Sequence, residues 1–168
     1  QHRVLYASAE KQVNSIIETY QNANPTERIA PIGALARKAL TLDKLEFAVT
    51  SDQNLPDTRE VKIEVEFELV GKDRFELECF QRSATEEHIC SLQLNGETSV
   101  SQIYDKAGLN FIPVEMREGH LEFDWARKYR QEELIEKSDL KGCLHNHSTY
   151  SDGIHMLEAM ARHLKDSS

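Results

Sequence analysis

Strict alternation of apolar and charged residues over residues 61–69 is the feature that most constrains the fold of this chain. Successive side chains of a β-strand point to opposite faces of a sheet, so the pattern predicts a strand with one apolar and one charged face. The apolar face needs a covering layer, which a chain of 168 residues with 39% apolar content can supply in one or two domains. The apolar positions are Val61, Ile63, Val65, Phe67 and Leu69, and the charged positions are Lys62, Glu64, Glu66 and Glu68.

The neighbouring segments predict a sheet that is backed by helices. Residues 44–49 alternate in the same way, and a turn at 71–73 leads to a third predicted strand over 74–80. A meander of strands with one polar face is typical of an antiparallel sheet that packs helices on its other face. Apolar residues at helical spacing predict a helix over 3–21. The predicted fold class is therefore α+β, with an antiparallel sheet.

The remaining segments are shorter or less periodic. Residues 117–130 are charged and predict a solvated connector, whereas residues 140–145 form a short apolar segment that predicts a strand. Further elements are predicted as a strand over 28–33 and as helices over 34–40, from residue 85, over 99–107 and over 154–164.

The composition predicts a cytoplasmic protein without a membrane partner. The start, Gln1-His2-Arg3, lacks the features of a signal peptide, and no stretch approaches the roughly 20 apolar residues of a membrane span. The cysteines have long spacings and form no Cys-x-x-Cys pair, which indicates free thiols rather than a disulfide framework or a zinc knuckle. They are Cys79, Cys90 and Cys143.

The net charge of −9 is concentrated in the middle of the chain. Residues 51–100 contain five basic and twelve acidic side chains, which leaves a charge of −7 there. Proteins that hold DNA through its phosphates show a basic patch instead. Any DNA binding by this chain alone is therefore expected to be weak.

The densest group of chemically capable residues lies at 141–155. Two histidines separated by one residue, His145 and His147, point to the same side at the end of the predicted strand, and Asp152 can add an oxygen ligand. An isolated His-x-His is more often a pair of exposed residues near a strand end. The Ser-Asp-Gly sequence that follows favours a metal half-site.

The same residues resemble the first motif of PHP domains, the polymerase and histidinol phosphatase superfamily. The motif consists of His145-Asn146-His147-Ser148 and then Tyr150-Ser151-Asp152-Gly153. The resemblance implies a phosphoesterase with a cluster of divalent metal ions, manganese or zinc, for which His145, His147 and Asp152 would be ligands. Cys143 departs from the aspartate that is usual at its position.

Upstream segments are similar to bacterial family X DNA polymerases of the repair type, which carry a PHP domain after the polymerase. The similar segments are Phe80-Gln81-Arg82-Ser83 with Glu87-His88, Ile103-Tyr104, Gly108-Leu109 and residues 111–119. The resemblance implies a nucleotidyltransferase-like palm over 1–80, a small helical thumb and connector over 81–137, and the start of a truncated PHP domain, its first βα unit, over 138–168. DNA and the rest of the PHP domain are the implied partners.

The polymerase motif itself is altered. Lys44, Glu46 and Glu66 stand where the family has three catalytic aspartates, and a lysine cannot bind magnesium. At the positions of the nucleotide-binding motif, Gly33 and Arg37 are kept, but Ala34 replaces a serine whose hydroxyl holds phosphate.

Magnesium at the palm is consequently not expected, and the altered residues are predicted to form cross-strand ion pairs. The preferred interpretation is an inactive polymerase site that serves as a scaffold for the PHP phosphoesterase or exonuclease. The alternative is an active, metal-dependent DNA nucleotidyltransferase in which Glu46 and Glu66 still hold a metal ion.

Overall fold

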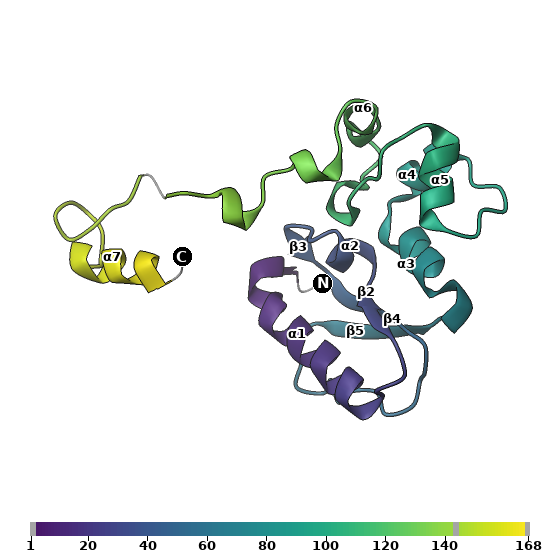
Figure 1. Ribbon diagram of the computed structural model, residues 1–168. Coiled ribbons are helices and arrows are strands. Elements are labelled where there is room, and N and C mark those ends of the chain that lie inside the picture. The colour runs from purple at the N-terminus through teal and green to yellow at the C-terminus, as the bar shows by residue number, and fades with distance from the viewer. Residues whose placement is uncertain (1–2, 143–144, 167–168) are drawn as a thin grey trace. The chain divides into compact units, whose positions relative to one another are not determined.

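The computed structural model describes residues 3–142 and 145–166, which form a mixed α+β structure (Figure 1). The chain divides into two compact units, Gln1–Glu132 and Glu133–Ser168. The first unit contains all the strands that the structure describes, together with helices α1 to α6. Among the described residues, no helix has the length and apolar character needed to cross a membrane.

The central sheet is mixed rather than antiparallel, which corrects the prediction from sequence. Its strand order is β2 (Ile29–Pro31), β4 (Lys44–Val49) and β5 (Glu64–Leu69). The β2–β4 pair is antiparallel, but β4 and β5 are parallel. The long connection 50–63 allows the parallel pairing. A connection of this length can return the chain to the starting edge of the sheet, whereas a short hairpin joins only antiparallel strands.

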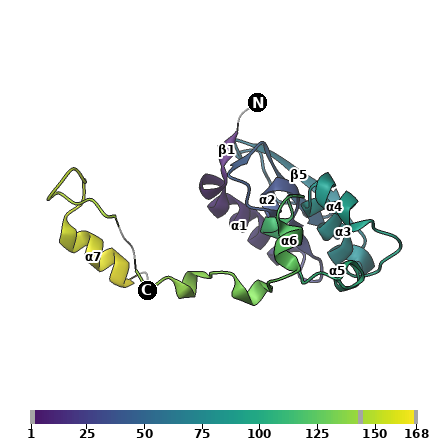
Figure 2. The same ribbon diagram turned by 90° about the horizontal axis from the view of Figure 1, so that it is seen from above.

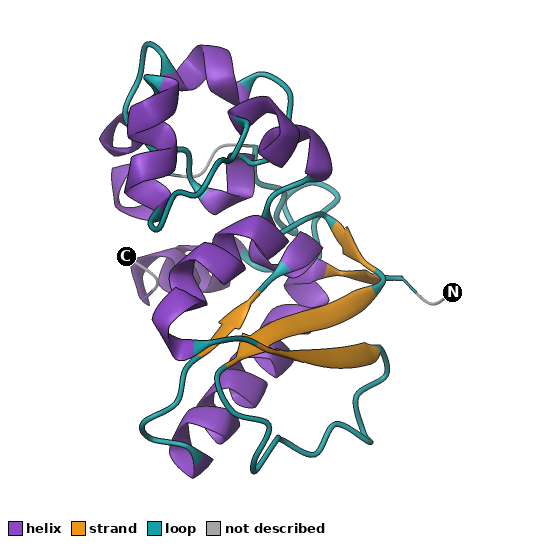
Figure 3. Cartoon of the chain, turned by 90° about the vertical axis from the view of Figure 1, so that its right-hand side faces the viewer, coloured by secondary structure: helices purple, strands orange, loops and turns teal. Residues whose placement is uncertain are grey.

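Helices lie on both faces of this sheet (Figure 3). Helix α1 (Tyr6–Ala23), which confirms the helix predicted near 3–21, packs against the apolar face of the sheet. Leu45, Phe47 and Val49 of β4 are almost fully buried there. Strands β1 (Val4–Leu5) and β3 (Thr41–Leu42) form a separate two-stranded ribbon.

Helix α3 (Phe75–Ser83) occupies the segment that was predicted as a third strand, so that prediction is wrong. The helix lies between two apolar cores and buries residues toward both. Phe75 joins the core above the sheet, whereas Leu77 and Phe80 join a second core among the helices. A helix with two buried stripes carries apolar residues at short intervals, which imitates the period of a strand.

The second core belongs to a helical subdomain, which lies away from α1 in Figure 1 and is seen from above in Figure 2. It contains α4 (Glu86–Leu92), α5 (Val100–Ala107) and α6 (Glu122–Ala126), and α5 confirms the helix predicted over 99–107. The prediction of a solvated connector over 117–130 is wrong in its first part, because Arg117, Glu122 and Ala126 are buried, whereas residues 127–130 are exposed. Long-range contacts with the helical core bury these three side chains.

The second unit contains one α-helix among its described residues, α7 (Leu157–Asp166), which confirms the helix predicted over 154–164 with a later start. The described residues of the predicted strand at 140–145 form no strand, and Cys143 and Leu144 lie outside the described residues. A strand needs a neighbour for its backbone hydrogen bonds. The described part of this unit contains no other strand that could provide one.

Candidate functional site

The polar face of the sheet brings together the three positions that the resemblance assigns to polymerase carboxylates. Glu46 and Glu66 are direct neighbours across the β4–β5 pair, and Lys44 precedes Glu46 by two residues on the same face. The ammonium nitrogen Nζ of Lys44 lies 2.9 Å from Oε1 of Glu46 and 2.8 Å from Oε2 of Glu66. A positive charge thus lies between the two carboxylates.

The electrostatics of this cluster favour a charged lysine. Hydrogen bonds to Glu46 first and to Glu66 second raise the pKa of Lys44 above its usual value. An ammonium has no lone pair for a metal ion, and its charge repels a cation from the space beside it. The three residues therefore do not fit a clamp for two magnesium ions, which needs carboxylates on both sides of the metals.

Gly33, the first residue of α2 (Gly33–Ala36), lies beside the same cluster. Its φ of +61° favours glycine, and a Cβ atom at this position would lie 2.5 Å from Oε2 of Glu46. The next residue, Ala34, packs its side chain against the core on the apolar face. Of the two residues, Gly33 alone borders the charged cluster.

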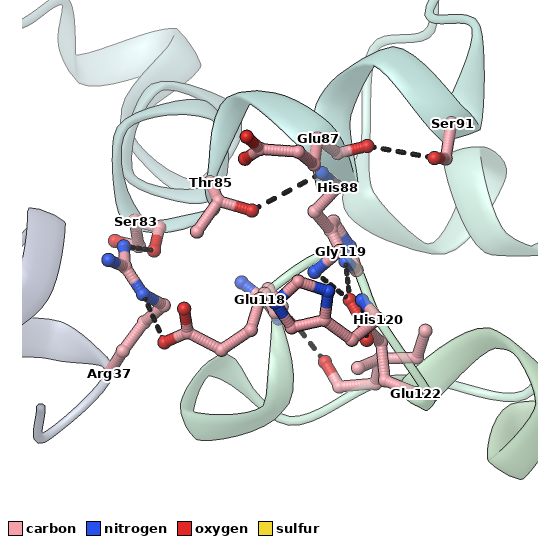
Figure 4. A network of polar contacts seen from close by, with 12 residues as sticks. Arg37, Ser83, Thr85, Glu87, His88, Ser91, Glu118, Gly119, His120 and Glu122 are labelled. Atoms are coloured by element: carbon pink, nitrogen blue, oxygen red, sulfur yellow. Dashed lines mark hydrogen bonds and ion pairs between the residues drawn. The ribbon is translucent and has the colours of Figure 1, made fainter.

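Arg37 does not join the cluster but connects the end of α2 to the helical subdomain (Figure 4). Its Nε atom donates to Oε1 of Glu118 at 2.8 Å, and its Nη1 atom donates to the carbonyl oxygen of Ser83 at 2.7 Å. The neighbouring Lys38 pairs with Glu115 at 2.9 Å. The guanidinium that the resemblance assigns to the nucleotide-binding motif is therefore engaged in a contact within the protein.

A buried polar network lies close to this contact, and the sequence interpretation did not identify it (Figure 4). Nδ1 of His88 lies 2.8 Å from Oε1 of Glu122, and Nε2 of His88 lies 3.2 Å from the hydroxyl of Tyr104. The Glu122 carboxylate also accepts the backbone N–H groups of Gly119 and His120. A glutamate shortly after a glycine turn, at the start of a helix, is the sequence signal that could have indicated it.

Burial decides the protonation of this network. Loss of solvation lowers the pKa of His88, although the carboxylate of Glu122 opposes that effect. Burial raises the pKa of Glu122, but its hydrogen bonds from His88 and the backbone outweigh this and leave the pKa lowered. A neutral His88 thus donates from Nδ1 to a Glu122 carboxylate and accepts from Tyr104. The network joins α4, α5 and α6 through His88, Tyr104 and Glu122. Because His88 has no exposed surface, its ring cannot contact a substrate.

The second unit contains the three residues predicted to bind metal. The ring centroids of His145 and His147 are 5.0 Å apart, and Nδ1 of His147 hydrogen-bonds Oδ1 of Asp152. This bond lowers the pKa of Asp152. The loop is closed by backbone hydrogen bonds from Thr149 to the carbonyl of His155, and from Gly153 to the carbonyl of Ser148.

Asp152 is predicted as a metal ligand, and in the structure its carboxylate contacts Nδ1 of His147. The Nε2 atom of His147 takes no part in this contact, and a carboxylate in such a position commonly orients a histidine that binds metal. Two imidazoles fit part of the coordination sphere of zinc or manganese. Within the described ranges, no group of three or more His, Cys, Asp or Glu side chains is placed to hold a metal ion.

No known protein-family model matches the chain, and a search of curated proteins finds no match either. The resemblance to family X polymerases and PHP domains therefore rests on the sequence motifs.

Proposed function

We propose that the first unit is a nucleotidyltransferase-like palm and thumb whose catalytic metals have been replaced by an internal ammonium group. In this proposal the unit does not transfer nucleotides and acts as a scaffold for a PHP phosphoesterase. The observation that carries the proposal is the placement of the Lys44 ammonium between Glu46 and Glu66.

The energetic argument compares a bound magnesium ion with the lysine already present. Two unit charges 4 Å apart interact by about 1 kcal/mol in water and by about 4 kcal/mol near a protein surface, and a divalent ion doubles either value. The Lys44 side chain is 39% exposed, so the smaller end of this range applies. Even that repulsion, about 2 kcal/mol, weakens magnesium binding by more than tenfold.

The surroundings of the cluster support the same conclusion. Gly33 keeps the positive φ of a glycine turn, but the Glu46 carboxylate occupies the space beside it. Ala34 contributes no hydroxyl, and Arg37 is engaged with Glu118 and Ser83. The shape of a nucleotide site is thus partly kept, while the groups that would hold phosphate are missing or used elsewhere.

The alternative function is an active, metal-dependent DNA nucleotidyltransferase. It is favoured by one observation, the direct pairing of Glu46 with Glu66 across neighbouring strands, which leaves the cluster with a net negative charge. In that case a metal ion would have to displace the Lys44 ammonium from both carboxylates.

Calorimetry and primer extension separate the two functions. The scaffold proposal expects neither magnesium-dependent nucleotide binding nor extension of a primed template in magnesium or manganese. Extension that is lost in Glu66→Ala but kept in Glu64→Ala, a matched change on the same strand face, would overturn the proposal. Nucleotide binding that needs magnesium in calorimetry would overturn it as well.

The second unit would contribute part of the PHP metal site in this proposal. His145 and His147 would bind manganese or zinc through ring nitrogens, and Asp152 would hold His147 in orientation. When bound, the metal would activate water for hydrolysis of a phosphoester. The remaining ligands would come from the rest of a PHP domain.

A further inference from the structure

Strand β5 lies at one edge of the central sheet, on the opposite side from β2 (Figure 1). In the part of the chain that the structure describes, β4 is the one strand that pairs with it. Alternate residues of an edge strand direct their backbone N–H and C=O groups outward, where they can pair with another strand. The outer edge of residues 64–69 therefore offers a template for a further strand.

The side chains of β5 give this edge two different faces. Glu64, Glu66 and Glu68 form an acidic row on the polar face. Val65 and Phe67 are partly buried on the apolar face, and Leu69 extends the apolar row with 60% of its surface exposed.

The charges of the acidic row are only partly compensated within the protein. Lys44 pairs with Glu66, and Nε of Arg82 lies 2.6 Å from Oε2 of Glu68. Glu64 is exposed at the beginning of the strand. The row thus keeps an excess of negative charge directly beside the open backbone edge.

We propose that the outer edge of β5 binds an extended peptide segment with alternating basic and apolar residues, which adds to the sheet as a fourth strand. Strand addition takes its affinity from backbone hydrogen bonds and its specificity from alternate side chains. Basic residues of the segment would lie opposite the glutamate row, and its apolar residues would extend the row that ends at Leu69. Opposite charges and apolar pairs directly across two strands both stabilise the pairing.

Other occupants fit this edge less well. A second copy of β5 that keeps the apolar rows together would place glutamate opposite glutamate, which destabilises a strand pair. Nucleic acid would meet a region, residues 51–100, that carries a charge of −7. The acidic row thus excludes these two occupants and selects a basic strand.

The test uses the whole chain and a labelled, end-capped peptide of sequence Lys-Val-Lys-Ile-Lys-Val, followed by fluorescence anisotropy. A peptide of the same composition, with its three lysines first and its three apolar residues last, is the control for charge alone. We expect the alternating peptide to bind at least about tenfold more tightly, because only it can match both rows at once. Hydrogen exchange of the backbone amides of β5 should slow when it binds.

Matched charge reversals locate the contact. Glu64→Lys should weaken binding of the alternating peptide by about fivefold, since it exchanges a cross-strand attraction for a repulsion. Glu18→Lys makes the same change on the exposed surface of α1 and should leave binding nearly unchanged. Circular dichroism of both variants checks that the fold is kept.

Three results would overturn the proposal: equal binding of both peptides, equal effects of the two reversals, or no slowing of exchange in β5. Self-association that protects β5 in the absence of peptide would identify a second copy as the occupant instead. None of these outcomes depends on whether the palm is catalytically silent, so the failure of one proposal is distinguishable from the failure of the other.

Discussion

Replacement of Lys44 by methionine removes the positive charge between Glu46 and Glu66 and keeps an unbranched side chain. The substitution deletes two ion pairs, at 2.9 and 2.8 Å, and leaves two carboxylates facing each other. Partly exposed pairs contribute about 0.2–1 kcal/mol each, and the remaining repulsion adds a similar amount. We therefore expect the free energy of unfolding to fall by about 1–2 kcal/mol at low salt.

Urea unfolding of the wild-type chain and of Lys44→Met measures this loss. Lys62→Met, which removes an exposed lysine shortly before β5, is the matched control and should change stability by less than about 0.5 kcal/mol. A double-mutant cycle with Glu66→Gln isolates the pair itself. A cycle without coupling, or equal losses in Lys44→Met and Lys62→Met, would refute the electrostatic argument.

Magnesium should distinguish Lys44→Met from the wild-type chain. Without the ammonium, the two carboxylates can share a divalent ion. A free magnesium concentration of ten times the dissociation constant would then stabilise the variant by about 1.4 kcal/mol. The wild-type chain should show no such gain. Equal stabilisation of both chains by magnesium would mean that the ammonium does not control access to this cluster.

Three further predictions concern the other polar contacts. Arg37→Ala should lower the free energy of unfolding by about 1–3 kcal/mol and speed hydrogen exchange over 113–119, whereas Arg3→Ala, at an exposed ion pair with Asp43, should cost less than about 1 kcal/mol. Burial lowers the pKa of His88 below its usual 6.5, so its contribution to stability is complete above pH 6.5 and is lost as the pH falls. Urea unfolding at several pH values should show the free energy of unfolding falling below pH 6.5 in the wild-type chain, and this part of the decrease should be missing in His88→Gln. In zinc or manganese titrations, His147→Ala should weaken binding while Cys143→Ser has no effect; dependence on Cys143 would instead indicate adventitious zinc binding.

The alternating segments show how much of the fold is present in the local sequence. In β4, the apolar row of Leu45, Phe47 and Val49 alternates with the charged Lys44 and Glu46, which specifies both the strand and its face against α1. The same period places Lys44 and Glu46 on one face, so two of the three residues of the cluster can be read from a single strand. The position of Glu66 beside them depends on the register between β4 and β5.

The segment 74–80 shows where local pattern misleads. Its apolar residues at short intervals predict a strand, but they belong to α3, which is buried between two cores. The spacing of apolar residues identifies a helix when one of its faces is buried. A helix that is buried on two sides has apolar residues on both, so the helical spacing is no longer recognisable. The second buried face exists only because the helical subdomain packs there.

The amino-acid sequence by itself determined which residues could form the charged face, the apolar core of the sheet and the motif around His145 and His147. The tertiary structure alone decided that β4 and β5 run parallel, that Arg37 contacts Glu118, and that Glu122 is buried against His88. These features join residues far apart in the chain, and each needs several elements to pack at once. Burial and pairing of this kind are properties of the assembled fold, because the free energy of a charged side chain depends on partners that its neighbours in sequence do not specify.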